Sequence, residues 1–196
     1  MLKEKLSQKI KVKKTGDHWC TPIELYSEIC EKYNGGSKFG FDPCANEWSS
    51  LGILNAISPT APYGKALGQP FFNGLETDWS QFRTVFMNPP YSQWQTWIKK
   101  AYEASQEGCT VLSLLMNASA EPAFHSHVMR GEIVEIRGRV QYVDPINNSK
   151  GSPTFGSILS IFRPYADYNG RPPVSSWWPY LHQKRGQSRR KIGAKP

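Results

Sequence analysis

The chain has 196 residues, of which 39% are hydrophobic, and it carries a formal net charge of +8. This length suits one domain with a sizeable core. No apolar run approaches 18 residues and the lysine-rich start has no signal-peptide pattern, so the sequence predicts a cytoplasmic protein and argues against a membrane partner.

The positive charge is concentrated at the two ends of the chain. Residues 1–14 hold six lysines and one glutamate, and residues 184–196 hold six basic residues and no acid. Residues 15–183 carry twelve basic and fifteen acidic side chains, a net charge of −3. We therefore expect an acidic globule between a basic N-terminal arm, residues 1–16, and a basic tail containing prolines and tryptophans, residues 165–196. Such arms attract a polyanion such as nucleic acid, although short basic ends can also be merely solvated.

The first half of the chain predicts one helix and two short strands. Residues 23–30 have apolar side chains at helical spacing, with Thr21 as the expected N-cap and Pro22 at the first helical position. Residues 38–42 resemble a short strand that ends in an acid, and residues 83–87 resemble a second apolar strand. Between them, residues 46–72 are rich in Gly, Pro, Ser and Asn, which predicts a lid or a substrate-contacting insertion.

The second half alternates in the same way. Residues 94–107 predict a helix whose tryptophans belong to the core, Gly108 ends it, and residues 110–116 predict a buried strand. A short helix over 121–129 follows. Two further strands, 133–137 and 157–162, are expected to pair antiparallel across the loop 144–154. This order predicts an α/β fold, with a mostly parallel, doubly wound sheet that has an antiparallel edge.

The string Asn88-Pro89-Pro90-Tyr91 follows the strand 83–87, at the end where open α/β sheets place their ligands. An exocyclic amine such as N6 of adenine is a poor nucleophile because its lone pair is delocalised into the ring. The Asn88 side-chain oxygen and the Pro89 carbonyl can each accept one amine hydrogen, which favours a pyramidal nitrogen aimed at a methyl donor. The two prolines fix the backbone in advance, and Tyr91 offers a flat face to a base swung out of its stack. An ordinary turn followed by a packed tyrosine is the alternative.

The cysteines and histidines show no spacing typical of a metal site, and we expect no metal. The four cysteines lack a Cys-x-x-Cys pattern, which favours reduced thiols over a disulfide framework. A zinc site from His18, Cys20 and Cys30 matches no familiar spacing. His125 and His127 stand two residues apart on a helix and face different sides, so they are interpreted as surface or packing residues. The cysteines are Cys20, Cys30, Cys44 and Cys109.

Several separated segments together resemble the DNA N-6-adenine methyltransferases of phages and prophages, the Dam-like family, over roughly residues 17–164. Residues 19–22 are similar to the Trp-x-Thr-Pro segment that opens the cofactor site in such enzymes. Residues 41–45 resemble the first motif, an acid at a strand end followed by a turn of small residues, although Pro43 stands where a glycine is common. Residues 71–75 with Asp78 and Trp79 resemble the family's Asp-Gly-Leu segment, residues 88–91 its catalytic motif, and residues 137–142 its Gly-Arg strand.

The resemblance implies a Rossmann-like methyltransferase domain over residues 17–164 that uses S-adenosylmethionine, in the host cytoplasm if the protein is phage-encoded. Asn73 stands where the family often has aspartate, and either Asn73 or Asp78 would accept from the amine of the cofactor's adenine. Gly138 and Arg139 would contact the substrate. The catalytic residues implied are Asn88, Pro89, Pro90 and Tyr91, and the cofactor-binding residues implied are Trp19, Thr21, Pro22, Asp42, Cys44, Ala45, Asn73 and Asp78.

The activity implied is in-line methyl transfer to the N6 amine of a flipped adenine in double-stranded DNA, for DNA methylation or restriction-modification. No covalent enzyme intermediate and no metal are needed. The chemistry alone equally permits an RNA adenine or a protein glutamine amide. A catalytically idle nucleic-acid-binding module, with Trp177, Trp178 and Tyr180 as a stacking surface, is an alternative from another class. Sequence specificity would lie in the loops 46–72 and 143–154.

Overall fold

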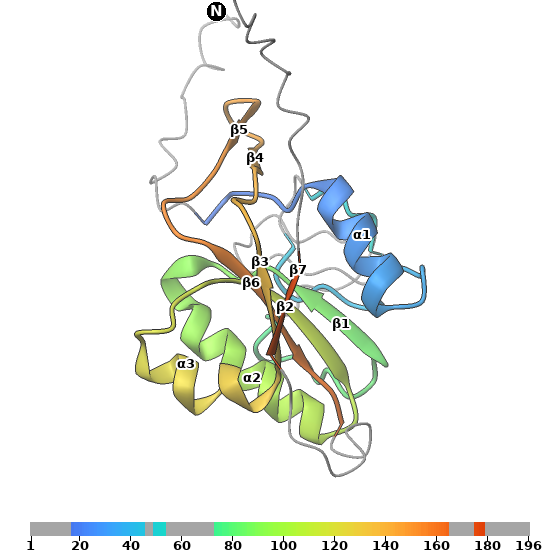
Figure 1. Ribbon diagram of the computed structural model, residues 1–196. Helices are drawn as coiled ribbons and strands as arrows, with labels where there is room; N and C mark the ends of the chain where they lie inside the picture. Colours follow the sequence, from blue (N-terminus) through green and yellow to red (C-terminus); the bar gives the residue numbers. More distant parts are fainter. Residues whose placement is uncertain (1–16, 46–48, 54–72, 165–174, 179–196) are drawn as a thin grey trace, which may run out of the picture.

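The computed structural model describes residues 17–45, 49–53, 73–164 and 175–178. Its main sheet has five strands in the spatial order β1-β2-β6-β3-β7 (Figure 1). The strands are β1 (Thr84–Met87), β2 (Thr110–Met116), β3 (Glu132–Ile136), β6 (Ser157–Phe162) and β7 (Ser175–Trp178). The segment expected as a C-terminal tail, residues 165–196, thus contributes the edge strand β7.

The strand directions correct the predicted sheet. β1 is parallel to β2 and β3 is parallel to β7, whereas β6 is antiparallel to both of its neighbours, β2 and β3. The predicted antiparallel pairing of residues 133–137 with 157–162 is confirmed. The antiparallel edge is wrong, because the antiparallel strand lies in the middle of a mixed sheet. All six residues of β6 are buried, and a strand that is apolar on both faces belongs at the centre of a sheet.

Residues 40–41 run beside the free side of β1. Phe86 N donates to Phe41 O at 3.0 Å, and Gly40 N donates to Thr84 O at 3.0 Å. The strand predicted over 38–42 is therefore in the expected place, but it forms a bridge between Phe41 and Val85 rather than a regular strand. This short pairing brings the end of the segment, Asp42, alongside the end of β1.

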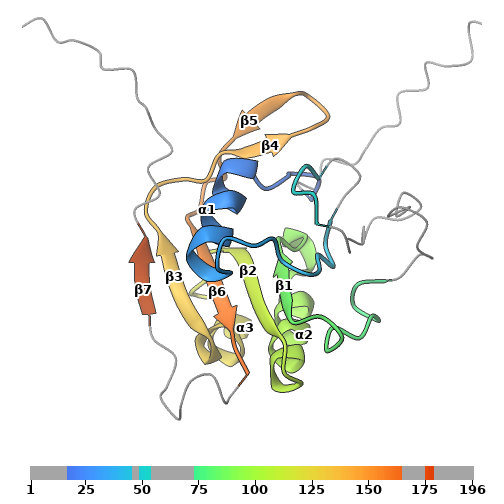
Figure 2. The ribbon, with the colours of Figure 1, turned by 90° about the vertical axis from the view of Figure 1, so that its right-hand side faces the viewer.

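Helices cover both faces of the sheet (Figure 2). α1 (Ile23–Tyr33) packs on one face, where Tyr26 contacts Phe86 edge to face with ring centroids 5.1 Å apart. α2 (Trp94–Gln106) and the shorter α3 (Pro122–Ser126) pack on the other, in one apolar cluster with Val85 and Met87. Because side chains alternate along a strand, neighbouring residues of β1 serve the two separate cores. The mixed α/β class is confirmed.

The helix ends agree with the sequence in part. The N-cap of α1 is Pro22, whose carbonyl accepts from Tyr26 N at 3.0 Å, so the predicted cap Thr21 is wrong. Thr21 is instead buried at the wall of a pocket. Gly108 ends α2 as predicted, with a φ of 100° that favours glycine.

The remaining predicted elements differ in detail. The helix predicted over 121–129 is split at His127 into α3 and the 3-10 turn η2 (Val128–Arg130). Trp94 and Trp97 are buried, as expected for core residues. No helix within the described ranges is both long enough and apolar enough to traverse a lipid bilayer. The basic arm 1–16, most of the insertion 46–72 and Tyr180 lie outside the described residues.

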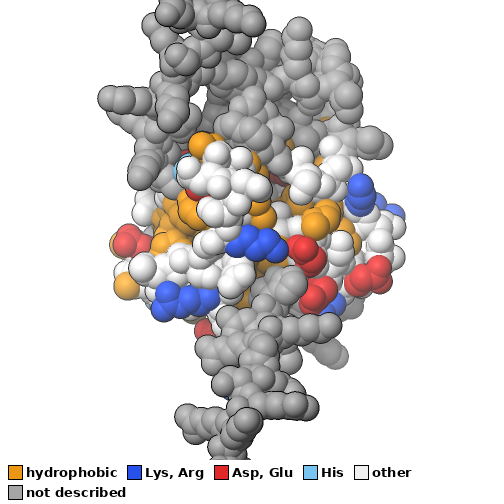
Figure 3. Space-filling view, turned by 90° about the horizontal axis from the view of Figure 1, so that it is seen from above, with side chains coloured by type: hydrophobic (Ala, Val, Ile, Leu, Met, Phe, Trp, Pro, Cys, Tyr) orange, Lys and Arg blue, Asp and Glu red, His pale blue; other side chains and the backbone are white. Residues whose placement is uncertain are grey.

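A hairpin replaces the loop expected between β3 and β6. β4 (Tyr142–Asp144) and β5 (Ser149–Gly151) pair antiparallel and rise from the end of the sheet to which β3 and β7 point (Figures 1 and 2). Asp144 Oδ1 accepts from the backbone N–H groups of Ile146 and Asn147 at 2.9 and 3.1 Å, and Asn148 adopts a φ of 48°. Seen from this end, apolar side chains gather near the middle of the described surface and charged ones lie mostly around them (Figure 3).

Candidate active site

The Asn88-Pro89-Pro90-Tyr91 segment leaves the carboxyl end of β1 and leads through the 3-10 turn η1 (Tyr91–Gln93) into α2. Pro90 is extended, with φ −53° and ψ 129°, and its carbonyl accepts from Gln93 N at 3.0 Å. This is the position predicted from the sequence, at the same end of the sheet from which the hairpin rises. We call residues 88–92, which contain the predicted catalytic residues, the catalytic loop.

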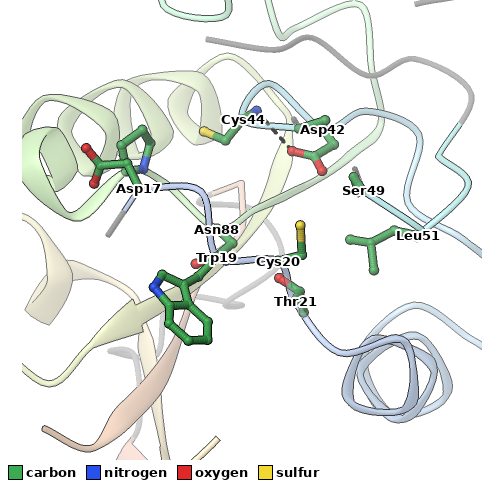
Figure 4. A pocket seen from close by; sticks show the side chains of 11 residues that line it. Asp17, Trp19, Cys20, Thr21, Asp42, Cys44, Ser49, Leu51 and Asn88 are labelled. Carbon is green, nitrogen blue, oxygen red and sulfur yellow. Dashed lines mark hydrogen bonds between the residues drawn. The ribbon is translucent and has the colours of Figure 1, made fainter. Parts of the chain in front are cut away.

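A small open pocket lies beside the catalytic loop (Figure 4). Three chain segments meet there: residues 17–21 before α1, residues 42–51 after the Phe41 bridge, and the catalytic loop. The pocket unites seven of the sequence-predicted site residues, which are Trp19, Thr21, Asp42, Cys44, Ala45, Asn88 and Pro90. Four lining residues had not been predicted, namely Asp17, Cys20, Ser49 and Leu51.

Asn88 presents an acceptor that the described part of the protein leaves unused. Its side-chain Oδ1 is buried, and no described residue donates a hydrogen bond to it. Leaving a buried acceptor unpaired costs about 1–3 kcal/mol, so such groups are rare unless a ligand or water completes them. Pro89 is buried next to it, and among the described residues no donor is bound to the Pro89 carbonyl. The expected pair of acceptors is therefore available together.

Asp42 is a second buried group that lines the pocket, with 4% of its surface exposed. Burial raises its pKa to about 7, and the Cys44 N–H, which donates to Oδ1 at 2.9 Å, partly opposes the rise. Burial, and secondarily the nearby Asp42, also raises the pKa of the Cys44 thiol well above its usual value. This buried carboxyl has a pKa near neutrality and accepts one hydrogen bond from the backbone. A ligand that donates further hydrogen bonds or carries positive charge would stabilise its ionised form.

The segment 73–79 supports the turn that follows Asp42. A Cβ on Gly74 would lie 2.3 Å from the Pro43 carbonyl oxygen, so the two backbones approach more closely than any side chain allows. Trp79 is fully buried and donates from Nε1 to Gly74 O at 2.8 Å. The resemblance of this segment to a family motif thus corresponds to a packing role for Gly74 and Trp79.

Asn73 and Asp78 do not line the pocket. Asn73 Oδ1 accepts from Leu75 N at 3.0 Å, and its amide donates to Glu76 Oε1 at 3.0 Å. Asp78 Oδ1 accepts from both the hydroxyl and the N–H of Ser80, which lowers the pKa of this exposed carboxyl. Both side chains therefore stabilise their own turns.

The segment 17–21 is held between the catalytic loop and the hairpin. Cys20 exchanges two backbone hydrogen bonds with Val143 of β4, at 2.8 and 3.0 Å. The Trp19 ring lies on Gly151 of β5, where an added Cβ would be 2.7 Å from the ring. Pro22, also predicted as a cofactor contact, is the buried N-cap of α1 and is not among the lining residues.

Tyr91 packs toward the hairpin rather than into the pocket. Its ring meets Phe155 and Tyr142 edge to face, with centroids 5.3 and 6.4 Å apart. Burial raises the pKa of the Tyr91 hydroxyl, and the neighbouring Tyr142 adds to this effect. Gly138 and Arg139 form part of a bend after β3, so the expected Gly-Arg strand is not formed there. Gly138 has a φ of 101°, and the exposed Arg139 donates from Nη1 to Pro153 O at 2.9 Å.

The cysteines and histidines occupy separate places. Within the described ranges, no group of three or more His, Cys, Asp or Glu side chains could hold a metal ion. The four cysteines are free thiols. His125 is exposed and contacts Ser119 O at 2.8 Å, and His127 packs beside the Tyr102 ring. These are the surface and packing positions expected for both histidines.

Comparison with known protein families gives one match. A family model described as "DNA N-6-adenine-methyltransferase (Dam)" matches residues 8–177, which include every residue of the pocket. No match was found among curated proteins or solved structures.

Proposed function

The chain belongs to the DNA N-6-adenine-methyltransferase (Dam) family, and on that premise we propose that its pocket brings S-adenosylmethionine to the N6 amine of an adenine flipped out of double-stranded DNA. The observation that carries the proposal is Asn88 Oδ1, which is buried without a donor among the described residues and lines the same pocket as the buried Asp42. The mixed sheet with helices on both faces is compatible with a Rossmann-like methyltransferase fold, which we propose for a domain that runs from residue 17 through β7.

The catalytic loop supplies the acceptors for the amine. Asn88 Oδ1 and the Pro89 carbonyl each accept a hydrogen bond from one N6 hydrogen, which localises the nitrogen lone pair and directs it away from the two acceptors. Neither acceptor has to break a hydrogen bond to a described residue, so the loop is prepared before the base arrives. Pro89 and Pro90 restrict the backbone, which keeps the carbonyl direction fixed.

Asp42 and its neighbours would hold the cofactor. S-adenosylmethionine, when bound, supplies an electrophilic methyl group on a sulfonium. The ionised Asp42 would accept hydrogen bonds from the ribose hydroxyls of the cofactor or contact its ammonium group, as acids at strand ends do in nucleotide-binding sheets. Cys44 and Ala45 are small enough for a close approach to the backbone, and Trp19 and Thr21 border the same space. A contact of Asn73 or Asp78 with the cofactor's adenine gains no support from their geometry, because both side chains bind within their own turns.

DNA is held outside this pocket. Arg139 and Gly138 lie on the hairpin side, where Arg139 is exposed and available to a phosphate or a base edge. Tyr91 is half-buried with its ring edge to face against two aromatic neighbours, so its orientation is fixed for a base to rest on it. The basic ends of the chain supply sequence-independent attraction to the DNA backbone.

The alternatives make different demands on the same residues. In an idle nucleic-acid-binding module, nothing would compensate the free energy lost by burying Asn88 Oδ1 without a donor among the described residues. Such a module would also not need the buried Asp42 carboxyl in the same pocket. An RNA adenine or a protein glutamine amide would use Asn88 in the same way, so only the choice of polymer separates these from the proposed function. The family match favours DNA.

The test is incubation of the protein with labelled S-adenosylmethionine and, separately, duplex DNA, RNA and a glutamine-containing protein. We expect N6-methyladenine in DNA at defined sites, found by mapping the label along the sequence. Asn88→Ala removes one transition-state hydrogen bond and should lower turnover by about 100-fold or more. Asn117→Ala is the matched control, because Asn117 follows β2 as Asn88 follows β1 but does not line the pocket. Label in RNA or protein alone, or normal turnover by Asn88→Ala, would contradict the proposal.

A further inference from the structure

Asp17 lines the pocket although it belongs to none of the recognised motifs (Figure 4). We infer that its carboxylate is a positioning residue that fixes the catalytic loop through Ser92. This inference rests on the proposed function, because it assigns Asp17 a role in presenting Asn88 and Pro89 to the amine.

The contact is made by two hydrogen bonds to one residue. The Ser92 hydroxyl donates to Asp17 Oδ2 at 2.8 Å, and the Ser92 backbone N–H donates to Asp17 Oδ1 at 3.3 Å. The partners are 75 residues apart in the sequence, so the contact ties two distant segments together. Hydrogen bonds to a carboxylate are stronger than those between neutral groups, and two of them at one residue define direction as well as distance.

Apart from the packing of the Tyr91 ring, the catalytic loop is held by few side-chain hydrogen bonds to described residues. Pro89 and Pro90 have no N–H group, so they cannot be anchored by donating hydrogen bonds. The Asn88 oxygen is unpaired among the described residues. Ser92 follows directly after Tyr91 and is exposed, so its orientation depends on the bonds that it makes. Asp17 provides both of the bonds that Ser92 makes as a donor within the described ranges.

The residues that follow Asp17 are held by the hairpin. His18 Nε2 lies 3.6 Å from the Asp144 carboxylate, and Cys20 pairs with Val143. The order of contacts therefore runs from the hairpin through residues 17–20 to Ser92 and the catalytic loop. Because a reacting group misplaced by about 1 Å can cost about 100-fold in rate, a small shift of Ser92 is expected to reach the chemistry.

The experiment compares Asp17→Ala, Asp17→Asn, Ser92→Ala and the double variant Asp17→Ala/Ser92→Ala in the full chain. Turnover is measured at saturating DNA and cofactor, and the Kd for S-adenosylmethionine is measured separately. We expect Asp17→Ala to lower kcat by about 10- to 100-fold with the Kd changed by less than about twofold. Asp17→Asn keeps one acceptor oxygen and should retain most of the activity. The double variant should be no slower than Asp17→Ala, because both changes break the same contact.

Three outcomes would overturn the inference. Effects of Asp17→Ala and Ser92→Ala that multiply in the double variant would mean that they act independently. A weaker Kd with unchanged kcat would make Asp17 a cofactor contact instead. Glu103→Gln, on the exposed side of α2, is the control for loss of an acidic side chain. The unmodified protein separates the two proposals, because its failure to methylate DNA would refute the proposed function, whereas normal methylation by Asp17→Ala would refute only this inference.

Discussion

The pKa of Asp42 predicts how cofactor affinity depends on pH. Burial raises this pKa to about 7 in the unliganded protein. At pH 6 about one Asp42 in eleven is then ionised, and at pH 8 about ten in eleven. If S-adenosylmethionine binds only the ionised form, its affinity should fall about tenfold between pH 8 and pH 6, and binding at pH 6 should release about 0.9 proton per site.

The same carboxyl affects folding stability in the opposite direction. A carboxyl with a raised pKa binds its proton more tightly in the folded protein than in the unfolded chain. The unliganded protein should therefore lose stability as pH rises from about 4 to about 7, by about 4 kcal/mol at most, with no further loss from this group above that range. Asp42→Asn should abolish this loss.

Calorimetric titration measures both the affinity and the proton release. Titrations at pH 6, 7 and 8, repeated at pH 6 in two buffers of different ionisation enthalpy, give the number of protons released. Asp42→Asn is the reference, because the amine of the ligand also titrates and its contribution is the same in both proteins. Equal pH dependence in the two proteins, or no proton release at pH 6, would refute the assignment of Asp42 as a cofactor contact.

Three further predictions follow from packing and charge. Gly74→Ala should destabilise the fold by about 1–3 kcal/mol in denaturant unfolding, because its Cβ would meet the Pro43 carbonyl, whereas Gly156→Ala, with open space around it, should change little. Deleting residues 184–196 removes six positive charges and should reduce the slope of log DNA affinity against log salt by up to about five while cofactor affinity stays the same. An unchanged slope would mean that the tail is only solvated. Arg139→Ala should lower turnover on DNA even at low salt, where the basic ends can hold the duplex, and full activity there would exclude Arg139 from the site.

The sequence predicted those parts of the site that local chemistry determines. Asn88 and Pro90 follow a strand of apolar residues, and Asp42 follows another extended segment, so all three fall at the carboxyl end of the strands, where open α/β sheets place their ligands. Neither prediction needed a distant partner. The buried β2 and the amphipathic α2 were found for the same reason, since their periodicity is contained in each segment.

The sequence could not predict what depends on distant contacts. Asp17 is positioned by Ser92, and Cys20 is positioned by Val143 of the hairpin. The residues next to Asp17 and Cys20 in the sequence do not indicate these partners. The position of β6 depends on pairing with β2 and β3, which are distant from it in the sequence. The edge position beside β3 is taken by β7, which lies in a segment whose prolines and tryptophans suggested a tail. Thr21 was predicted as an N-cap from its residue type, but Pro22 is the N-cap and Thr21 lines the pocket.

The position of β6 between β2 and β3 determines when the central strands can pair during synthesis. β2 and β3 precede β6 in the chain, yet neither is hydrogen-bonded to the other, and each pairs along its length with β6. A chain that ends before residue 157 therefore leaves β2 with one open edge and β3 with two, because β7 also follows later. Such edges recruit other strands, so partly synthesised chains are the species most exposed to aggregation and to chaperones. Because the hairpin that supports Trp19 also emerges just before β6, the pocket and the centre of the sheet are completed at nearly the same stage of synthesis.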